Sequence, residues 1–329
     1  MLILNANEIR QALPMDQTIA AMKDAYASLS GGTAVAPLRT RIPIPSHDAL
    51  SLFMPAYMKS DSGEALSVKV VSLFPNNPSR GLAYIQAAVL VFEADTGRAV
   101  ALLEGSSLTA IRTGAGSGAA IDILARKDSK VVAIFGAGTQ GRTQLEAACT
   151  ARKIKTAFIY NPTVEKAEAF ARELAGINSI PKDIRVARTP KEAIENADIM
   201  CTATGSKQPV FEDKDVKSWT HISAIGAYTT EMHELPVETV ARSRIVVDSY
   251  ATVMEEAGDI VKAIQAGAIT ESSIHAELGE IVLGRKPGRS TQQEITFFKS
   301  VGNAVQDAAA AQLALKNARE MKLGIEIEF

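Results

Sequence analysis

A glycine-rich segment in the middle of the chain constrains the fold more than any other feature. The residues KVVAIF at 130–135 form a candidate strand, and Gly136-Ala137-Gly138-Thr139-Gln140-Gly141 follows it directly as a G-x-G-x-x-G pattern. A helical pattern over 140–150 comes next, and a second candidate strand follows the glycines by about 20 residues, as a dinucleotide-binding unit requires. This order predicts the first βαβ unit of a Rossmann domain.

Each glycine of the pattern has its own physical role in such a site. Gly136 permits the tight turn, Gly138 lets the backbone approach a pyrophosphate, and Gly141 lets the helix pack closely on the strand. The helix then begins with free N–H groups and a partial positive charge that favour phosphate binding. The other interpretation is a glycine-rich turn that binds nothing. The expected cofactor-binding residues in this segment are Gly136, Ala137, Gly138, Thr139, Gln140 and Gly141.

The rest of the chain divides into two styles of sequence. Residues 1–105 contain short strand-like runs, such as 66–74 and 87–92, and a helical pattern over 15–29, which together predict an α+β domain. From Lys130 onward strands and helices alternate, which predicts a doubly wound parallel sheet and an α/β fold class. The expected strands there are 130–135, 156–160, 184–187, 198–203, 221–225 and 244–248.

The last part of the chain shows a long helical pattern over 292–323, with a tendency to break at Gly302. Its length predicts that the chain returns from the Rossmann half to the first half. We therefore expect one domain made of residues 1–120 with 305–329, and a Rossmann domain made of residues 121–304.

Composition excludes several classes of protein. The 329 residues include 35 basic and 37 acidic ones without a basic stripe, so nothing favours a nucleic-acid partner. No apolar run is long enough to predict a membrane span, and the first residues do not resemble a signal peptide. The two cysteines, Cys149 and Cys201, lie in apolar contexts and are expected to be free, buried thiols in the reducing cytoplasm, rather than a disulfide or a nucleophile. His233-Glu234 is not extended to HExxH, so we expect no metal site.

The end of the second Rossmann strand bears on the choice of cofactor. An acidic residue there would bind the ribose of NAD, but the sequence reads Tyr160-Asn161-Pro162-Thr163. A 2′-phosphate would meet no repulsion, and Asn161, Thr163 and Lys166 could donate to it, so NADP is favoured while NAD stays possible. Further along, Thr202, Ala203 and Thr204 follow the fourth strand at the edge where the cofactor should cross; the threonines could equally be plain strand-end hydroxyls.

Three cationic positions lie in apolar or small-residue surroundings of the first half. Lys69 interrupts the strand-like run LSVKVVSLF, Arg112 lies in LTAIRTGAGSG, and Arg39 follows Pro37 together with Arg41. A buried cation needs an anion or a polar cleft. We therefore expect a pocket that binds a carboxylate at Arg39, Lys69 and Arg112. The alternative is that each cation pairs with solvent or with a glutamate among Glu64, Glu93 and Glu104.

These segments resemble the ornithine cyclodeaminase/mu-crystallin family, and the resemblance covers essentially the whole chain. The similar segments are PLRT at 37–40, MPAY at 54–57, SVKVVSLF at 67–74, LTAIRTGAGSG at 108–118, IFGAGTQG at 134–141, IYNPTVEKAE at 159–168, SAIGAY at 223–228, HEL at 233–235, AELGEIVLGRKPGR at 276–289 and FFKSVGNAVQD at 297–307.

The resemblance implies a homodimer joined through the first domain, with the substrate in a cleft between the domains. It also implies that Arg39, Lys69 and Arg112 contact the substrate and that Lys69 and Arg112 are catalytic. The resemblance places Asn161 and Thr163 at the adenosine ribose. The other residues implied to bind cofactor or substrate are Arg112 and Thr113 near the pyrophosphate, Gly226, and Ser300 with Val301 beside the nicotinamide.

Two departures from the family pattern argue against ornithine cyclodeamination. The segment that carries an aspartate in ornithine cyclodeaminases reads Gly226-Ala227-Tyr228-Thr229-Thr230, and Leu52 stands where they carry a glutamate. A basic substrate amine would lose both anionic partners. The expected activity is instead the NAD(P)H-dependent reduction of Δ1-pyrroline-2-carboxylate or Δ1-piperideine-2-carboxylate to L-proline or L-pipecolate.

In this reaction Lys69 would protonate or polarise the imine. We expect no acidic residue next to Arg39, Lys69 and Arg112. The alternatives are alanine dehydrogenase, the disfavoured ornithine cyclodeaminase, and a mu-crystallin-like protein that binds a ligand together with NADP.

Overall fold

The computed structural model describes residues 1–328, which form two compact units. The first unit consists of residues 1–112 and 303–328, and the second of Thr113–Gly302. The chain passes between the units inside helix α3 (Gly105–Leu124), and again just before helix α11 (Ala304–Met321). None of the helices within residues 1–328 has the length and apolarity needed to span a bilayer.

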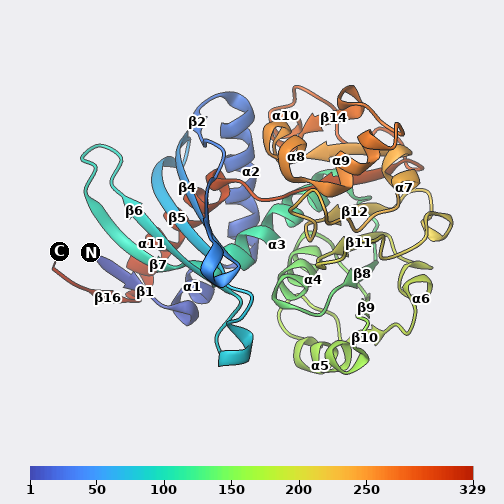
Figure 1. Ribbon diagram of the computed structural model, residues 1–329, viewed down its shortest axis with the longest axis horizontal. Coiled ribbons are helices and arrows are strands. Elements are labelled where there is room, and N and C mark those ends of the chain that lie inside the picture. The colour runs from blue at the N-terminus through green and yellow to red at the C-terminus, as the bar shows by residue number, and fades with distance from the viewer. Residues whose placement is uncertain (329) are drawn as a thin grey trace. The chain divides into compact units, whose positions relative to one another are not determined.

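The second unit is built on a parallel sheet in the order β10-β9-β8-β11-β12-β15-β13-β14 (Figure 1). Every neighbouring pair in this sheet is parallel, so the predicted doubly wound sheet is confirmed. Its strands are β8 Val131–Phe135, β9 Thr156–Tyr160, β10 Asp183–Val186, β11 Ile199–Thr202, β12 His221–Ala224, β13 Ser243–Val247, β14 Ile274–Glu277 and β15 Ile295–Lys299. The α-helices between them are α4 Thr139–Ala151, α5 Val164–Leu174, α6 Pro190–Ile194, α7 Val237–Ala241, α8 Tyr250–Glu256, α9 Gly258–Gln265 and α10 Leu278–Val282.

Strand β8 shows how this sheet is buried on both faces. Its residues alternate between two apolar clusters, with Val132 and Ile134 in one and Ala133 and Phe135 in the other. Burial on both faces is typical of a parallel sheet covered by helices on each side. The carboxyl ends of the strands, where the glycine turn begins, are therefore held by a rigid core.

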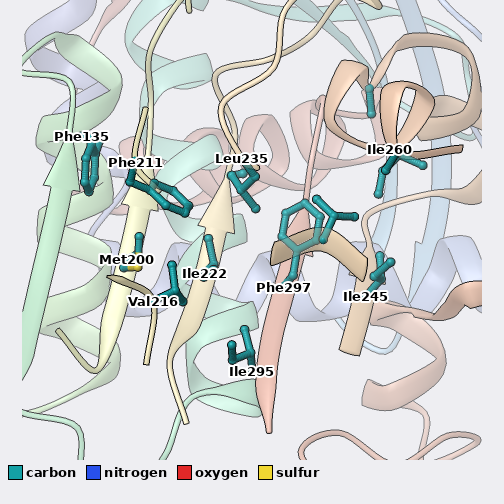
Figure 2. Packing of buried hydrophobic residues seen from close by; sticks show 14 of the residues in the cluster. Phe135, Met200, Phe211, Val216, Ile222, Leu235, Ile245, Ile260, Ile295 and Phe297 are labelled. Atoms are coloured by element: carbon teal, nitrogen blue, oxygen red, sulfur yellow. The ribbon is translucent and has the colours of Figure 1, made fainter. Parts of the chain in front are cut away.

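The helical pattern predicted over 292–323, with a tendency to break at Gly302, is wrong in the part before that glycine. Residues Ile295–Lys299 form β15, a strand in the interior of the sheet, and all five are buried. Figure 2 shows Phe297 of this strand packed among Leu235 and Ile245. A short run that is buried on every side has no two-residue alternation, so its pattern cannot be distinguished from that of a buried helix.

The first unit is a mixed sheet packed on helices, as predicted for an α+β domain. The strand order is β16-β1-β7-β6-β5-β4-β2, with β3 also paired to β4, and all pairs except β1 with β7 are antiparallel. The strands are β1 Leu2–Leu4, β2 Ala34–Val35, β3 Thr40–Ile44, β4 Ala49–Ser60, β5 Gly63–Leu73, β6 Ile85–Phe92, β7 Ala99–Glu104 and β16 Ile325–Glu326. The helices of this unit are α1 Ala6–Ala12, α2 Met15–Gly31 and α11, and its 3-10 turns lie at Pro45–His47 and Pro78–Arg80. The 3-10 turns of the second unit lie at Asp213–Asp215 and Glu271–Ser273.

The two cysteines are free and buried, as predicted. Burial raises the pKa of the Cys149 thiol to about 12, with a contribution from Glu146, and burial also raises the pKa of Cys201. A thiol with a raised pKa carries little thiolate and is a poor nucleophile.

Candidate active site

The glycine turn has the geometry that the sequence predicts. Gly136, directly after β8, adopts a φ of +103°, and a Cβ there would lie 2.6 Å from the Ala203 carbonyl oxygen. A Cβ on Gly141 would lie 2.0 Å from the Gly136 carbonyl oxygen, so only glycine lets helix α4 pack this closely. Gly138 differs, because a Cβ there would meet nothing within 4 Å. Its glycine therefore leaves open space above the start of α4, where no side chain caps the helix.

A cavity of ≈ 710 Å³ adjoins this turn within the second unit. It lies at the carboxyl ends of β8, β9 and β11, where open α/β sheets bind ligands. An extended dinucleotide matches this arrangement, with its phosphates at the free end of α4 and its adenosine near β9. The lining residues are Phe135, Gly136, Ala137, Gly138, Tyr160, Asn161, Pro162, Lys166, Ala203, Thr204, Gly205, Ser206 and Val210.

Asn161 supports the glycine turn with its side chain. Its Oδ1 accepts a hydrogen bond from the Ala137 N–H at 3.2 Å, and its Nδ2 donates to the Thr163 carbonyl oxygen at 2.9 Å. Both ends of the amide thus contact the backbone, while the second N–H of Nδ2 makes neither of these bonds and Asn161 also lines the cavity. Lys166 likewise lines the cavity, with an exposed side chain.

Glu234 organises the edge of the sheet after β11, and sequence reasoning missed it. Its carboxylate accepts hydrogen bonds from the Thr202 and Thr204 hydroxyls and from the N–H groups of Thr204 and Gly226, at 2.7 to 2.9 Å. Thr202 is fully buried, so its predicted contact with the cofactor is replaced by a supporting contact with Glu234. Burial, together with the neighbouring Asp259, raises the pKa of Glu234.

The segment after β15 is held in the same way by Asp248, a buried residue. Its Oδ2 accepts hydrogen bonds from the Ser300 hydroxyl at 2.7 Å and from the N–H groups of Val301 and Gly302 at 3.1 and 3.0 Å. Burial raises the pKa of Asp248, while these donors oppose that shift. Ser300 and Val301, both predicted site residues, are therefore fixed by one carboxylate at the end of β13.

Lys69 lies in an apolar row that crosses the sheet of the first unit. Its neighbours on the adjacent strands are Met54 on β4 and Val89 on β6, and Val89 in turn faces Leu103 on β7. All four side chains are at most 3% exposed. No group of the sheet can compensate the ammonium in this row, so its partner must come from a helix packed on the sheet.

That partner is Asp307, in the first turn of α11. Its Oδ2 lies 2.7 Å from the Lys69 Nζ and its Oδ1 lies 2.9 Å from the Arg112 Nε, with all three side chains at most 6% exposed. The expectation that the cations have no acidic residue beside them is therefore wrong. For Lys69 and Arg112 the alternative pairing is also wrong, because Glu64, Glu93 and Glu104 bind other groups.

Arg112 is held by a second side chain of the same helix turn. Its Nη1 donates to the Gln306 Oε1 at 3.3 Å, and the Gln306 Nε2 donates to the Tyr26 hydroxyl at 2.8 Å. The remaining nitrogen, Nη2, makes none of these bonds. Two nitrogens of the guanidinium are thus committed to α11, and Nη2 keeps its donors.

The charged groups around Lys69 shift its pKa in opposite directions. Burial, reinforced by Arg112 and Arg39, lowers the pKa of Lys69 to about 7, while Asp307 opposes this shift. Burial alone would raise the pKa of Asp307, but Arg112 and Lys69 hold it below its ordinary value. Arg39, Lys69 and Arg112 therefore form one interacting group, as the sequence predicts, with Asp307 as the member that was missed. Asp307 closes the segment FFKSVGNAVQD, so its place in that segment was the signal that could have found it.

The sequence matches the ornithine cyclodeaminase/mu-crystallin family over residues 1–322. It is 39% identical to a Δ1-pyrroline-2-carboxylate reductase of Bacillus cereus, an alignment that covers 100% of both chains.

Two solved structures extend this similarity to the fold. A Δ1-pyrroline-2-carboxylate reductase of Thermococcus litoralis, in complex with NADH and L-proline, is 42% identical with a TM-score of 0.94, covering 99% of this chain and 100% of that one. An archaeal alanine dehydrogenase dimer with bound NAD is 32% identical with a TM-score of 0.91, covering 100% of this chain and 99% of that one.

Proposed function

The chain belongs to the ornithine cyclodeaminase/mu-crystallin family, and on that premise we propose that it reduces Δ1-pyrroline-2-carboxylate to L-proline with a nicotinamide cofactor. The observation that carries the proposal is the buried group of Lys69, Arg112 and Asp307, in a chain whose glycine turn fits a dinucleotide. Similarity over the full length to reductases of this substrate supports it.

The substrate carboxylate pairs with the arginines. Arg112 offers its Nη2 donors, which make no bond to α11, and Arg39 adds positive charge near Lys69. A planar guanidinium suits a carboxylate, which can accept two parallel hydrogen bonds from it. This pairing fixes the position of the imine carbon next to the carboxylate.

Lys69 supplies the proton. Reduction of the C=N bond adds a hydride to carbon and a proton to nitrogen, and the hydride comes from the nicotinamide when it is bound. An ammonium whose pKa is lowered to about 7 gives up its proton readily near neutral pH. The neutral amine regains a proton from solvent once the product leaves, and Asp307 favours this step because it stabilises the ammonium.

A basic substrate amine does not fit this site. Leu52 lies on the same face of β4 as Met54 and is 6% exposed, and it brings no charge. The carboxylate that binds Gly226 in the segment 226–230 is that of Glu234, and this group is fully buried and accepts four hydrogen bonds from the protein. Asp307 is engaged by two cations. Ornithine cyclodeamination therefore lacks the anion it needs.

The choice between NADP and NAD depends on the end of β9. No carboxylate among the residues that line the cavity there repels a 2′-phosphate, and Lys166 offers it a cation. We infer that the enzyme accepts NADPH as well as NADH, with Lys166 as the residue that favours NADPH.

The face of the first unit's sheet opposite α11 suits contact with a second copy of the chain. Lys69 and the other buried residues of β5 face α11, whereas Pro55, Val68, Leu90 and Leu102 form an apolar row on the opposite face and stay partly exposed. Such a surface is typical of an interface between subunits. We propose a homodimer through this face. The variant Val68→Glu introduces a charge there and should convert the dimer to a monomer, as measured by light scattering.

The buried thiols suit a reducing compartment such as the cytoplasm.

Steady-state assays with Δ1-pyrroline-2-carboxylate test the proposal directly. Oxidation of NADH and NADPH should depend on this substrate and yield L-proline, with Δ1-piperideine-2-carboxylate and pyruvate plus ammonia as the comparison substrates. Turnover of pyruvate and ammonia without turnover of either cyclic imine would refute the proposal in favour of an alanine dehydrogenase.

A further inference from the structure

The cap of helix α11 holds Asp307 in a fixed position. It lies in the first turn of α11, where Asn303 caps the helix: the Asn303 Oδ1 accepts from the Val305 N–H and the Gln306 Oε1 accepts from the Asn303 N–H. An acidic side chain in the first turn also interacts favourably with the helix dipole. The carboxylate therefore has a fixed position before any substrate binds.

The surroundings of Lys69 contain more positive than negative charge. From β4 and β6 the facing residues are Met54 and Val89, which carry no charge. The charged groups that act on it are Arg112 from α3, Arg39 from the segment between β2 and β3, and Asp307 from α11. The Asp307 carboxylate thus faces two buried cations, Lys69 and Arg112, in a region with little exposure to water, where charges interact strongly.

We propose that Asp307 is a positioning residue for the reaction: its two oxygens hold Lys69 apart from Arg112, so that Lys69 keeps its proton for the imine nitrogen and Arg112 keeps its Nη2 donors for the substrate carboxylate. This inference rests on the proposed function. Without the carboxylate, the buried ammonium and guanidinium would repel each other, and the amine would lose its proton because that is the only charge the pair can release.

A purely structural ion pair would behave differently. Breaking it would lower stability and reduce activity by a similar factor at every pH. A positioning role predicts a change in the protonation of Lys69 itself, which makes the two roles separable.

The test is a titration of the lysine side chains by 15Nζ NMR in the full-length protein, with the Lys69 signal assigned by its loss in Lys69→Arg. In Asp307→Asn the Lys69 midpoint should fall by at least one pH unit below that of the wild type. In Arg112→Gln, which leaves the pair of Lys69 and Asp307 in place, the midpoint should rise. Asp122→Asn serves as the control, because Asp122 also lies on α3 but pairs with Arg152. This variant should leave the Lys69 midpoint unchanged.

Kinetics supply a second readout of the same proposal. At pH 8 the Asp307→Asn variant should reduce the imine about tenfold more slowly than the wild type for each unit by which the Lys69 midpoint falls, with NADH affinity unchanged, and the deficit should shrink as the pH is lowered. An unmoved Lys69 midpoint in both variants, or a deficit that is the same at every pH, would overturn the inference. An inactive wild type would overturn the proposed function instead, and the NMR titration would still decide whether Asp307 controls the protonation of Lys69.

Discussion

Each unit of this protein contains a lysine buried against an aspartate at the same distance, yet the two pairs have opposite surroundings. Lys69 and Asp307 lie 2.7 Å apart in the first unit, and Lys299 and Asp259 lie 2.7 Å apart in the second, with all four side chains at most 1% exposed. Distance and burial alone therefore do not distinguish a reactive pair from a structural one.

The balance of charge does distinguish them. Around Lys299 there are two carboxylates, and backbone N–H groups satisfy the excess negative charge: Asp259 accepts from Glu234 and Leu235, and Glu234 accepts from Thr204 and Gly226. Around Lys69 the excess is positive, and the protein supplies no second anion among the groups that act on it. A complete network stabilises the fold, whereas an incomplete one can bind an anionic substrate.

The largest expected effect comes from removing the reactive lysine. Lys69→Met should lower kcat/KM for Δ1-pyrroline-2-carboxylate by about 1,000-fold, since a positioned general acid contributes about 100- to 10,000-fold. The dissociation constant for NADH, measured by fluorescence, should stay unchanged because the glycine turn is untouched. Full activity in this variant would show that Lys69 is not the proton donor.

The same substitution at Lys299, in the other lysine–aspartate pair, should lower the free energy of unfolding. Lys299→Met leaves Asp259 and Glu234 without their cation, and breaking a buried pair in this way costs about 3–5 kcal/mol. Urea unfolding should show this loss. If the variant were as stable as the wild type, the Lys299 network would not be a structural element.

Substitutions at two glycines of the cofactor turn should likewise separate an effect on cofactor binding from an effect on stability. Gly138→Ala places a methyl group in open space at the start of α4, so it should keep the fold and weaken dinucleotide binding about tenfold. Gly141→Ala would place a Cβ 2.0 Å from the Gly136 carbonyl oxygen and should lower the thermal unfolding temperature. Equal cofactor affinity in Gly138→Ala and the wild type would contradict the assignment of the phosphate site.

The smallest effect concerns the choice of cofactor. Lys166→Ala should raise the KM for NADPH about fivefold, corresponding to roughly 1 kcal/mol for an exposed ion pair, and leave the KM for NADH unchanged. A parallel change in both values would mean that Lys166 does not contact the 2′-phosphate.

The sequence predicts local features of this molecule better than long-range ones. The strand, glycine turn and helix at 131–151 depend on neighbouring residues, and periodicity and glycine spacing were sufficient to find them. The strand at Ile295–Lys299 was missed because burial on every side removes the alternation that marks a strand.

The predicted cations were found because a charge in an apolar run is visible in the sequence. Asp307 was not, since the residue that it binds, Arg112, lies 195 positions away and only the folded chain joins them. The same holds for Glu234 and Asp248, which act on segments that sequence spacing does not connect to them. Anionic partners of this kind leave no periodic signal.

Proton uptake on ligand binding measures the charge imbalance at Lys69 most directly. Pyrrole-2-carboxylate is a planar anion that resembles the substrate, and its ring nitrogen does not titrate near neutral pH. Bound at pH 8, where a lysine with a pKa of about 7 is mostly neutral, it should raise that pKa and draw protons from the buffer. Calorimetry in buffers of different ionisation enthalpy should detect this uptake in the wild type and not in Lys69→Met. Binding without proton uptake, or the same uptake in both proteins, would contradict the account.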